Sequence, residues 1–138
     1  MTYTLDTNTI SYYLRGEGEV IKNLHKEIFE KGNIYAISHF SVYEIRRWLS
    51  YKPNSATRLY TAKFEALFQN TQHLAGMHIP VWEKAAEIYN DLRSRGQLIG
   101  DADIIIAAYC LVNNYTLVTR NIKDFSRIIG LQMVDWYE

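Results

Sequence analysis

The chain alternates between short apolar segments of strand character and longer segments of helical periodicity, and this alternation limits the folds that it can adopt. The expected strands cover residues 2–5, 34–38, 115–119 and 131–135. The expected helices cover residues 8–15, 19–31, 41–51, 55–70, 81–95, 102–113 and 125–129. Strands that alternate with helices favour an α/β fold, in which a mainly parallel sheet carries helices on both faces.

Three segments refine this expectation. The helices at 41–51 and 55–70 follow one another without a strand, which predicts a helical hairpin inserted after the second strand and standing off the sheet. Residues 77–80 are expected to form a short strand or a connection. Residues 102–113 are apolar nearly all round, so this helix should be buried. Ser41, as an N-cap, and Glu44 three residues later have the spacing of a capping box.

Length and composition set the broad class. A chain of 138 residues without linkers or repeats predicts one domain over residues 1–138, and this length can bury a full core. The charges of the 15 basic and 15 acidic residues cancel, so the net charge gives no indication of nucleic-acid binding. A single cysteine, Cys110, fits a reducing compartment. We see no signal peptide and no apolar run of membrane-spanning length, and we expect a soluble cytoplasmic protein.

Acidic residues recur at the edges of the expected elements. Each opens an element just after a loop, and the set comprises Asp6, Glu44, Asp101, Asp103 and Asp124. Each has an ordinary interpretation as a turn residue, a helix cap or a first-turn acid. Together they could lie at one edge of the sheet, where ligands collect in open α/β folds. Clustered carboxylates repel one another unless a cation offsets them, so convergence would indicate a divalent metal site and phosphodiester chemistry.

Four motifs carry a resemblance that runs along nearly the whole chain. They are Leu5-Asp6-Thr7-Asn8, residues 41–45 (SVYEI), residues 99–108 (IGDADIIIAA) and residues 117–125 (LVTRNIKDF). In this order and spacing, the sequence resembles the PIN-domain ribonucleases, specifically the VapC toxin family of type II toxin–antitoxin systems. The resemblance implies a PIN-like α/β/α sandwich and an endoribonuclease that hydrolyses structured RNA, either tRNA or rRNA, to inhibit translation.

The resemblance also assigns roles to individual residues. Asp6, Glu44 and Asp103 match the family's metal-binding acids and would hold Mg²⁺, for which Mn²⁺ is expected to substitute. Asn121 stands where many members have a fourth acid, so it would act by orienting a water. Asp101 and Asp124 are additional acids that could supply the missing charge. The expected reaction needs no nucleophilic side chain, and Cys110 is expected to be a core residue.

Basic and aromatic residues suggest where RNA would bind. Arg46 and Arg47 follow Glu44 on the same helix, and Arg120 precedes Asn121. Arginine contacts phosphates, although an ordinary amphipathic helix with a solvated basic side explains Arg46 and Arg47 equally well. The resemblance implies two protein partners, a second copy of the chain in a homodimer and a VapB-type antitoxin. An antitoxin arginine inserted among the acids would be the expected inhibitory device.

Other functions are compatible with parts of the pattern. A PIN-type nuclease could process RNA without a toxin role, and the same fold could be a catalytically weak module that binds RNA or protein. A receiver-like phosphoacceptor domain would need a phosphorylatable aspartate after a central strand and a late partner lysine, and Lys123 lies in the wrong kind of segment. A haloacid-dehalogenase-type phosphatase would need an aspartate where Asn8 stands.

Overall fold

The sheet has four parallel strands in the order β2-β1-β3-β4. The computed structural model describes residues 1–16, 18–71 and 76–137. The strands are β1 (Thr2–Leu5), β2 (Ile34–Ala36), β3 (Thr116–Val118) and β4 (Met133–Val134). β1 pairs with β2 in the register Tyr3 to Tyr35, and with β3 in the register Thr4 to Leu117. The chain leaves β1 toward β2 and then returns past β1 to β3, so β1 and β3 flank the topological switch point.

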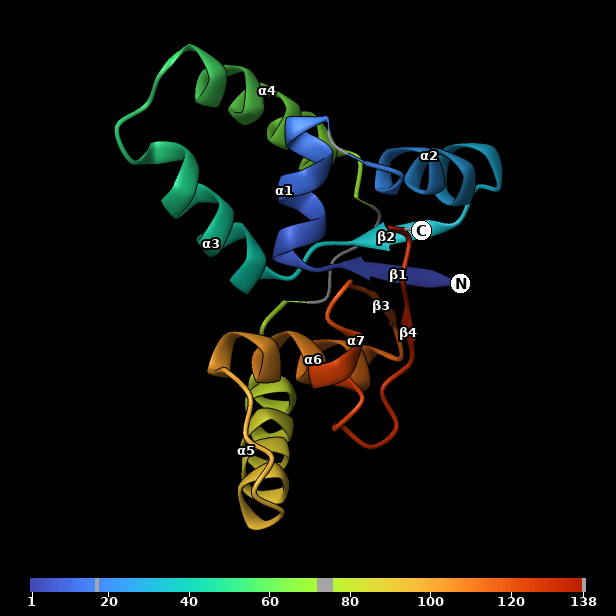
Figure 1. Ribbon diagram of the computed structural model, residues 1–138, viewed down its shortest axis with the longest axis vertical. Coiled ribbons are helices and arrows are strands. Elements are labelled where there is room, and N and C mark those ends of the chain that lie inside the picture. Colours follow the sequence, from blue (N-terminus) through green and yellow to red (C-terminus); the bar gives the residue numbers. More distant parts are fainter. Residues whose placement is uncertain (17, 72–75, 138) are drawn as a thin grey trace.

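Helices cover both faces of this sheet. α1 (Thr7–Arg15), α2 (Val20–Leu24), its π-helical continuation η1 (His25–Glu30), α3 (His39–Ser50) and α4 (Ser55–Gln69) lie above the sheet in Figure 1. α5 (Ile79–Ser94), α6 (Asp101–Asn113) and α7 (Ile122–Phe125) lie below it. α3 and α4 form the hairpin predicted after the second strand. The α/β fold with a parallel sheet between helices is confirmed.

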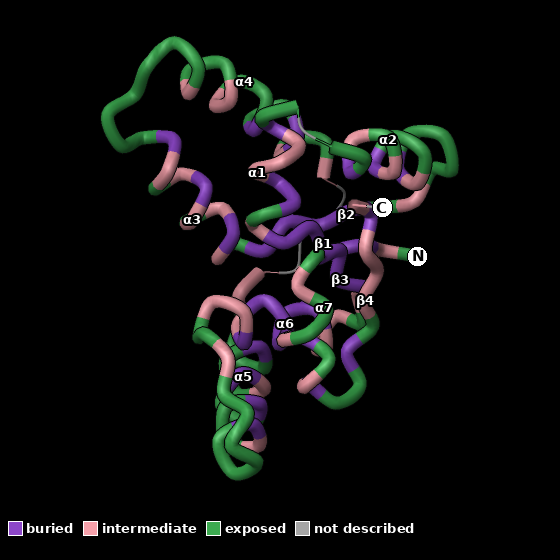
Figure 2. The backbone as a smooth tube through the Cα atoms, viewed as in Figure 1, coloured by how far each residue is buried: buried purple, intermediate pink, exposed green. Residues whose placement is uncertain are grey.

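The alternation of side chains along the strands builds a core on each face. Val118 packs with the α1–α4 side, and its neighbour Leu117 packs with the α5–α7 side. Tyr35 and Ala36 divide between the two faces in the same way. Helix α6 is buried over most of its length, as its apolar sequence predicts (Figure 2). None of the described helices is long and apolar enough to cross a membrane.

Two local expectations are wrong, and a third is resolved between its alternatives. Ser38, three residues before Ser41, is the N-cap of α3, because its extended backbone lets Oγ accept the Ser41 N–H at 3.1 Å. The helix expected at 125–129 forms one turn earlier, after the Asn121 N–H donates to Thr119 Oγ1 at 3.0 Å. Of the two alternatives for residues 77–80, the connection is right for 77–78 and the strand is not, because Ile79 and Pro80 already open α5, where proline loses no helical hydrogen bond.

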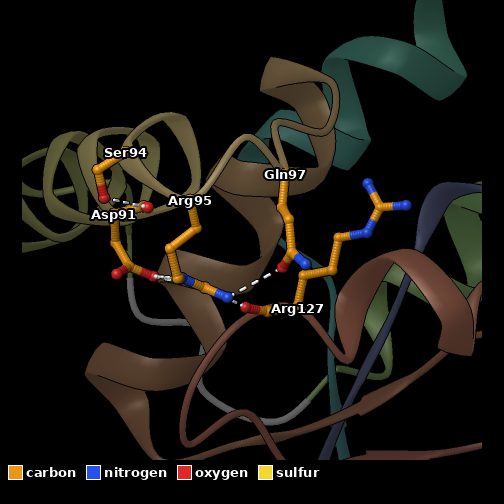
Figure 3. A network of polar contacts seen from close by, with 5 residues as sticks. All are labelled: Asp91, Ser94, Arg95, Gln97 and Arg127. Atoms are coloured by element: carbon orange, nitrogen blue, oxygen red, sulfur yellow. Dashed lines mark hydrogen bonds and ion pairs between the residues drawn. The ribbon is translucent and has the colours of Figure 1, made fainter.

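A polar network fastens the end of α5 to the turn after α7 (Figure 3). Arg95 Nη2 donates to Asp91 Oδ2 and to the Arg127 carbonyl oxygen, both at 2.6 Å. Arg95 Nη1 also donates to Gln97 Oε1 at 2.9 Å. The network therefore holds the segment between α5 and α6, which leads into the acid-bearing first turn of α6.

Candidate active site

The carboxyl end of β1 places Asp6 at the switch point. Asp6 follows Leu5 directly, is 7% exposed, and is the N-cap of α1, where Oδ1 accepts the Thr9 N–H at 2.7 Å. Burial is the main cause that raises the pKa of Asp6, and hydrogen bonds from Thr9 and Thr119 act in the opposite direction. The buried Asp6 carboxyl group therefore caps α1 and also lines a pocket at this edge of the sheet.

Glu44 reaches the same edge from α3. Because Ser38 caps α3, the Glu44 carboxylate does not act in the expected capping box. It accepts a hydrogen bond from Thr7 Oγ1 at 2.5 Å. The Ser41 hydroxyl lies 3.1 Å from the same Thr7 oxygen, so hydroxyl groups from α1 and α3 meet beside Glu44. Thr7 fixes one Glu44 oxygen and joins the element after β1 to the helix after β2.

Asp103 brings the third carboxylate, from the first turn of α6. Burial comes first among the causes that raise the pKa of Asp103 to about 6, followed by the negative charges of Asp6, Asp124 and Glu44. These are the neighbours expected if the acids converge, since like charges disfavour the ionised form. Four acids from four segments therefore share one electrostatic environment.

Asn121 and Asp124 complete the edge next to β3. Asn121 Nδ2 donates to Asp124 Oδ2 at 3.1 Å, and Asp124 Oδ1 also lies 3.5 Å from Arg127 Nη2. Asn121 lines a pocket together with Asp6. Thr119, fully buried, accepts the Asn121 N–H and also hydrogen-bonds Asp6, so it links the ends of β3 and β1.

Asp101 lies apart from the other acids. It is exposed and lines a separate hollow of about 480 Å³ with Trp82, Tyr89 and other residues of α5 and α6. Residues two positions apart on a helix point to different sides, so Asp101 and Asp103 cannot both face the switch point. The helix periodicity thus divides this acidic pair.

The donor set fits a hard divalent cation in chemistry and charge. Carboxylate oxygens are the ligands that Mg²⁺ and Mn²⁺ prefer, and a cation would relieve the repulsion that raises the pKa of Asp103. Within residues 1–16, 18–71 and 76–137, no three acidic, histidine or cysteine side chains are close enough to enclose a metal ion. The acids are therefore neighbours, but their side chains do not enclose a common metal position.

The three arginines predicted to bind RNA have different surroundings. Arg46 pairs with Glu65 at 3.4 Å and lies 5.2 Å from the ring centre of Phe64, so it joins α3 to α4. Arg47 is exposed and lies 5.1 Å from the ring centre of Tyr43. Arg120 lines the same pocket as Asp6 and Asn121. Arg47 and Arg120 are thus better placed than Arg46 to meet a ligand.

The surroundings of Cys110 exclude it as a nucleophile. Cys110 is fully buried in α6, and burial is the main cause that raises the pKa of its thiol to about 12. A thiol of this kind is not ionised near neutral pH and is not reached by solvent. The expectation that Cys110 is a core residue is confirmed.

Comparisons with known proteins show the family and the fold to which the chain is similar. The PIN domain family matches residues 3–131. "Ribonuclease VapC1" of Haemophilus influenzae is 29% identical over 141 residues, covering 99% of this chain and 98% of the relative. The "tRNA(fMet)-specific endonuclease VapC" of Salmonella typhimurium is 25% identical over 138 residues, with the same coverage. A VapBC2 crystal structure from Rickettsia felis, bound to a promoter DNA fragment, superposes with a TM-score of 0.83 at 28% identity, covering 99% of both chains.

Proposed function

Because this chain belongs to the VapC ribonucleases of the PIN-domain family, we propose that it is a metal-dependent endoribonuclease and the toxin of a type II toxin–antitoxin pair. One observation carries the metal dependence. Burial raises the pKa of Asp103 most, and the charges of Asp6, Asp124 and Glu44 raise it further, which supports a site where these four carboxylates are neighbours. Such a cluster is costly without a cation and well suited to hold one.

Each residue of the cluster has a distinct task in this proposal. Asp6, Glu44 and Asp103 would hold Mg²⁺ or Mn²⁺. When bound, such a cation acidifies water and offsets the negative charge that builds on a phosphodiester during hydrolysis. Thr7 keeps one Glu44 oxygen in place through its hydrogen bond. Asn121, held by Asp124, directs its amide group toward the pocket that Asp6 also lines, where it can orient a water.

We further propose structured RNA as the substrate class and a VapB-type antitoxin as the partner. The Salmonella relative is named for cleavage of a tRNA, and the Rickettsia structure is a complex of toxin and antitoxin. Arg47 and Arg120 are exposed and lie close in sequence to Glu44 and Asn121. We also propose that the chain forms a homodimer.

Cleavage of total cellular RNA by the purified chain tests the activity. We expect defined fragments from the wild type with Mg²⁺ or Mn²⁺, and none with EDTA. Asp6→Asn should be inactive yet folded, because asparagine is as good an N-cap as aspartate. Asp101→Asn is the matched control, since it removes one acid outside the cluster, and it should cleave like the wild type.

The result can also contradict the proposal. Equal cleavage by Asp6→Asn and the wild type, or cleavage that persists in EDTA, would show that the acids are not the working site. Expression of both variants in cells separates a toxin from a processing nuclease. Growth should stop with the wild type and Asp101→Asn, and continue with Asp6→Asn.

A further inference from the structure

A pocket of about 390 Å³ opens directly beside the acid cluster. Its volume lies within the range of about 300–1,000 Å³ that is usual for small-ligand sites. One face of α1, the loop after β3 and the C-terminal segment form its walls. The lining residues are Asp6, Asn8, Tyr12, Arg15, Arg120, Asn121 and Tyr137. Three of them, Asn8, Tyr12 and Arg15, follow the helical spacing of four and three residues.

Charge changes sign along this pocket. Asp6 lies at the end of the pocket beside the acid cluster, and the wall formed by α1 extends away from that end. Since a helix rises 1.5 Å per residue, Arg15 lies about 10 Å along the axis from Asn8. Arg120 is exposed and has no ion pair within the described residues; its guanidinium lies 5.7 Å from the Tyr137 ring centre. A ligand that fits this pattern carries negative charge beyond the group held at the acids.

Aromatic rings line the same pocket. Tyr12 and Tyr137 meet edge to face, with ring centres 5.2 Å apart and planes at 86°. Tyr137 is held in place because its hydroxyl lies 2.9 Å from Thr9 Oγ1. The guanidinium of the exposed Arg15 lies 5.0 Å from the Tyr12 ring centre, so a base would stack on this ring by displacing that side chain. The Asn8 and Asn121 side-chain amides can hydrogen-bond a base edge.

We propose that this pocket holds one unpaired nucleotide of the RNA strand, next to the phosphodiester that is cut, with Arg120 on its phosphate and Tyr12 stacked on its base. This inference rests on the proposed nuclease function and names the substrate feature that the site selects. An unpaired nucleotide is favoured because a base inside a helix would first have to be unstacked and unpaired before it could meet a tyrosine, which costs free energy. A basic peptide would be repelled by Arg120, which lines the pocket.

Binding of fluorescein-labelled single-stranded oligouridine of about ten nucleotides tests the proposal. Full-length protein in the Asp103→Asn background keeps the RNA intact during an anisotropy titration. Tyr12→Leu should weaken binding at least about fivefold, whereas Tyr12→Phe, which keeps the ring, should stay within about twofold. Arg120→Gln should reduce the slope of log affinity against log salt by about 0.7, while Arg93→Gln on the exposed side of α5 should leave it unchanged. The thermal midpoint of each variant checks folding.

The outcomes separate this proposal from the activity itself. If the wild type cuts RNA but Tyr12→Leu and Arg120→Gln bind oligouridine like their controls, the pocket proposal is wrong and the nuclease stands. If the pocket variants lose binding as expected but the wild type shows no metal-dependent cleavage, the pocket proposal stands and the nuclease does not. Unchanged RNA affinity together with weaker binding of an arginine-containing peptide would assign the pocket to a protein partner and overturn the proposal.

Discussion

Replacing Asp103 by asparagine should stabilise the metal-free protein, although it removes a site residue. Raising the pKa of Asp103 from 3.8 to about 6 corresponds to about 3 kcal/mol of destabilisation when the group ionises. Asp103 is only partly buried, so solvent screening reduces this to about 1–1.5 kcal/mol. The lost charge at the start of α6 costs about 0.5 kcal/mol. The net gain of about 0.5–1 kcal/mol should raise the thermal midpoint by about 2–5 °C.

The sign of the pH dependence follows from the raised pKa. Ionisation of Asp103 penalises the folded state, because the folded pKa of about 6 lies above the unfolded value of 3.8. The penalty is absent below about pH 4, grows as the pH rises from about 4 to about 6, and is complete above that. The advantage of Asp103→Asn should therefore be small near pH 4.5 and full near pH 7.5.

Thermal unfolding followed by circular dichroism in EDTA measures this effect. Asp101→Asn is the matched control, because it removes a charge from the same helix turn but outside the cluster. It should lower the midpoint slightly at both pH values. Added Mg²⁺ should then raise the midpoint of the wild type and of Asp101→Asn more than that of Asp103→Asn. If Asp103→Asn is no more stable than Asp101→Asn near pH 7.5 in EDTA, neither burial nor the neighbouring acids penalise the ionised Asp103, and the reasoning is refuted.

Three further tests substitute residues that make contacts at the site, on α3 and in the network between α5 and α7. Thr7→Val removes the hydrogen bond to Glu44 and should lower the cleavage rate about tenfold, with Thr7→Ser restoring it; equal rates for both variants would contradict a positioning role. Arg47→Ala should weaken RNA binding and flatten its salt dependence, whereas Arg46→Ala should mainly lower the thermal midpoint; unchanged binding by Arg47→Ala across a salt series would contradict this. Arg95→Met should lower the free energy of unfolding by about 1–2 kcal/mol in urea titrations, because it leaves the Arg127 carbonyl oxygen without its donor; an unchanged midpoint would show that the network carries no stability.

The fold could be predicted well because burial of the sheet on both faces produces clearly apolar strands between helices of regular periodicity. Residues 2–5 and 102–113 have strand and helix signals that tertiary contacts reinforce, and both elements appear within one residue of the expected bounds. The misplaced features are set by single hydrogen bonds instead. Ser38 and Ser41 are both competent caps, and only the end of β2 decides that Ser38 is used.

The acids of the candidate site could be picked out from the sequence, whereas the residues that contact them could not. Asp6, Glu44 and Asp103 stand out because carboxylates at element ends have few structural reasons to cluster. Asp101 could have been separated from Asp103 by helical geometry alone. Thr7 and Tyr12 gave no comparable signal, since a threonine in a turn and a tyrosine on a helix are common, and their roles depend on Glu44 and Tyr137 arriving from distant segments.

The switch point also determines when the acid cluster can exist during synthesis. β1 is an inner strand that needs β3 beside it, and the site joins Asp6 near the start of the chain to Thr119 and Asn121 near its end. At about 5–20 residues per second, a ribosome needs roughly 6 to 23 seconds to add the 113 residues from Asp6 to Thr119. If the proposed nuclease activity needs all of these segments, a chain synthesised in this order stays inert until Thr119 and Asn121 have been added and have reached β1.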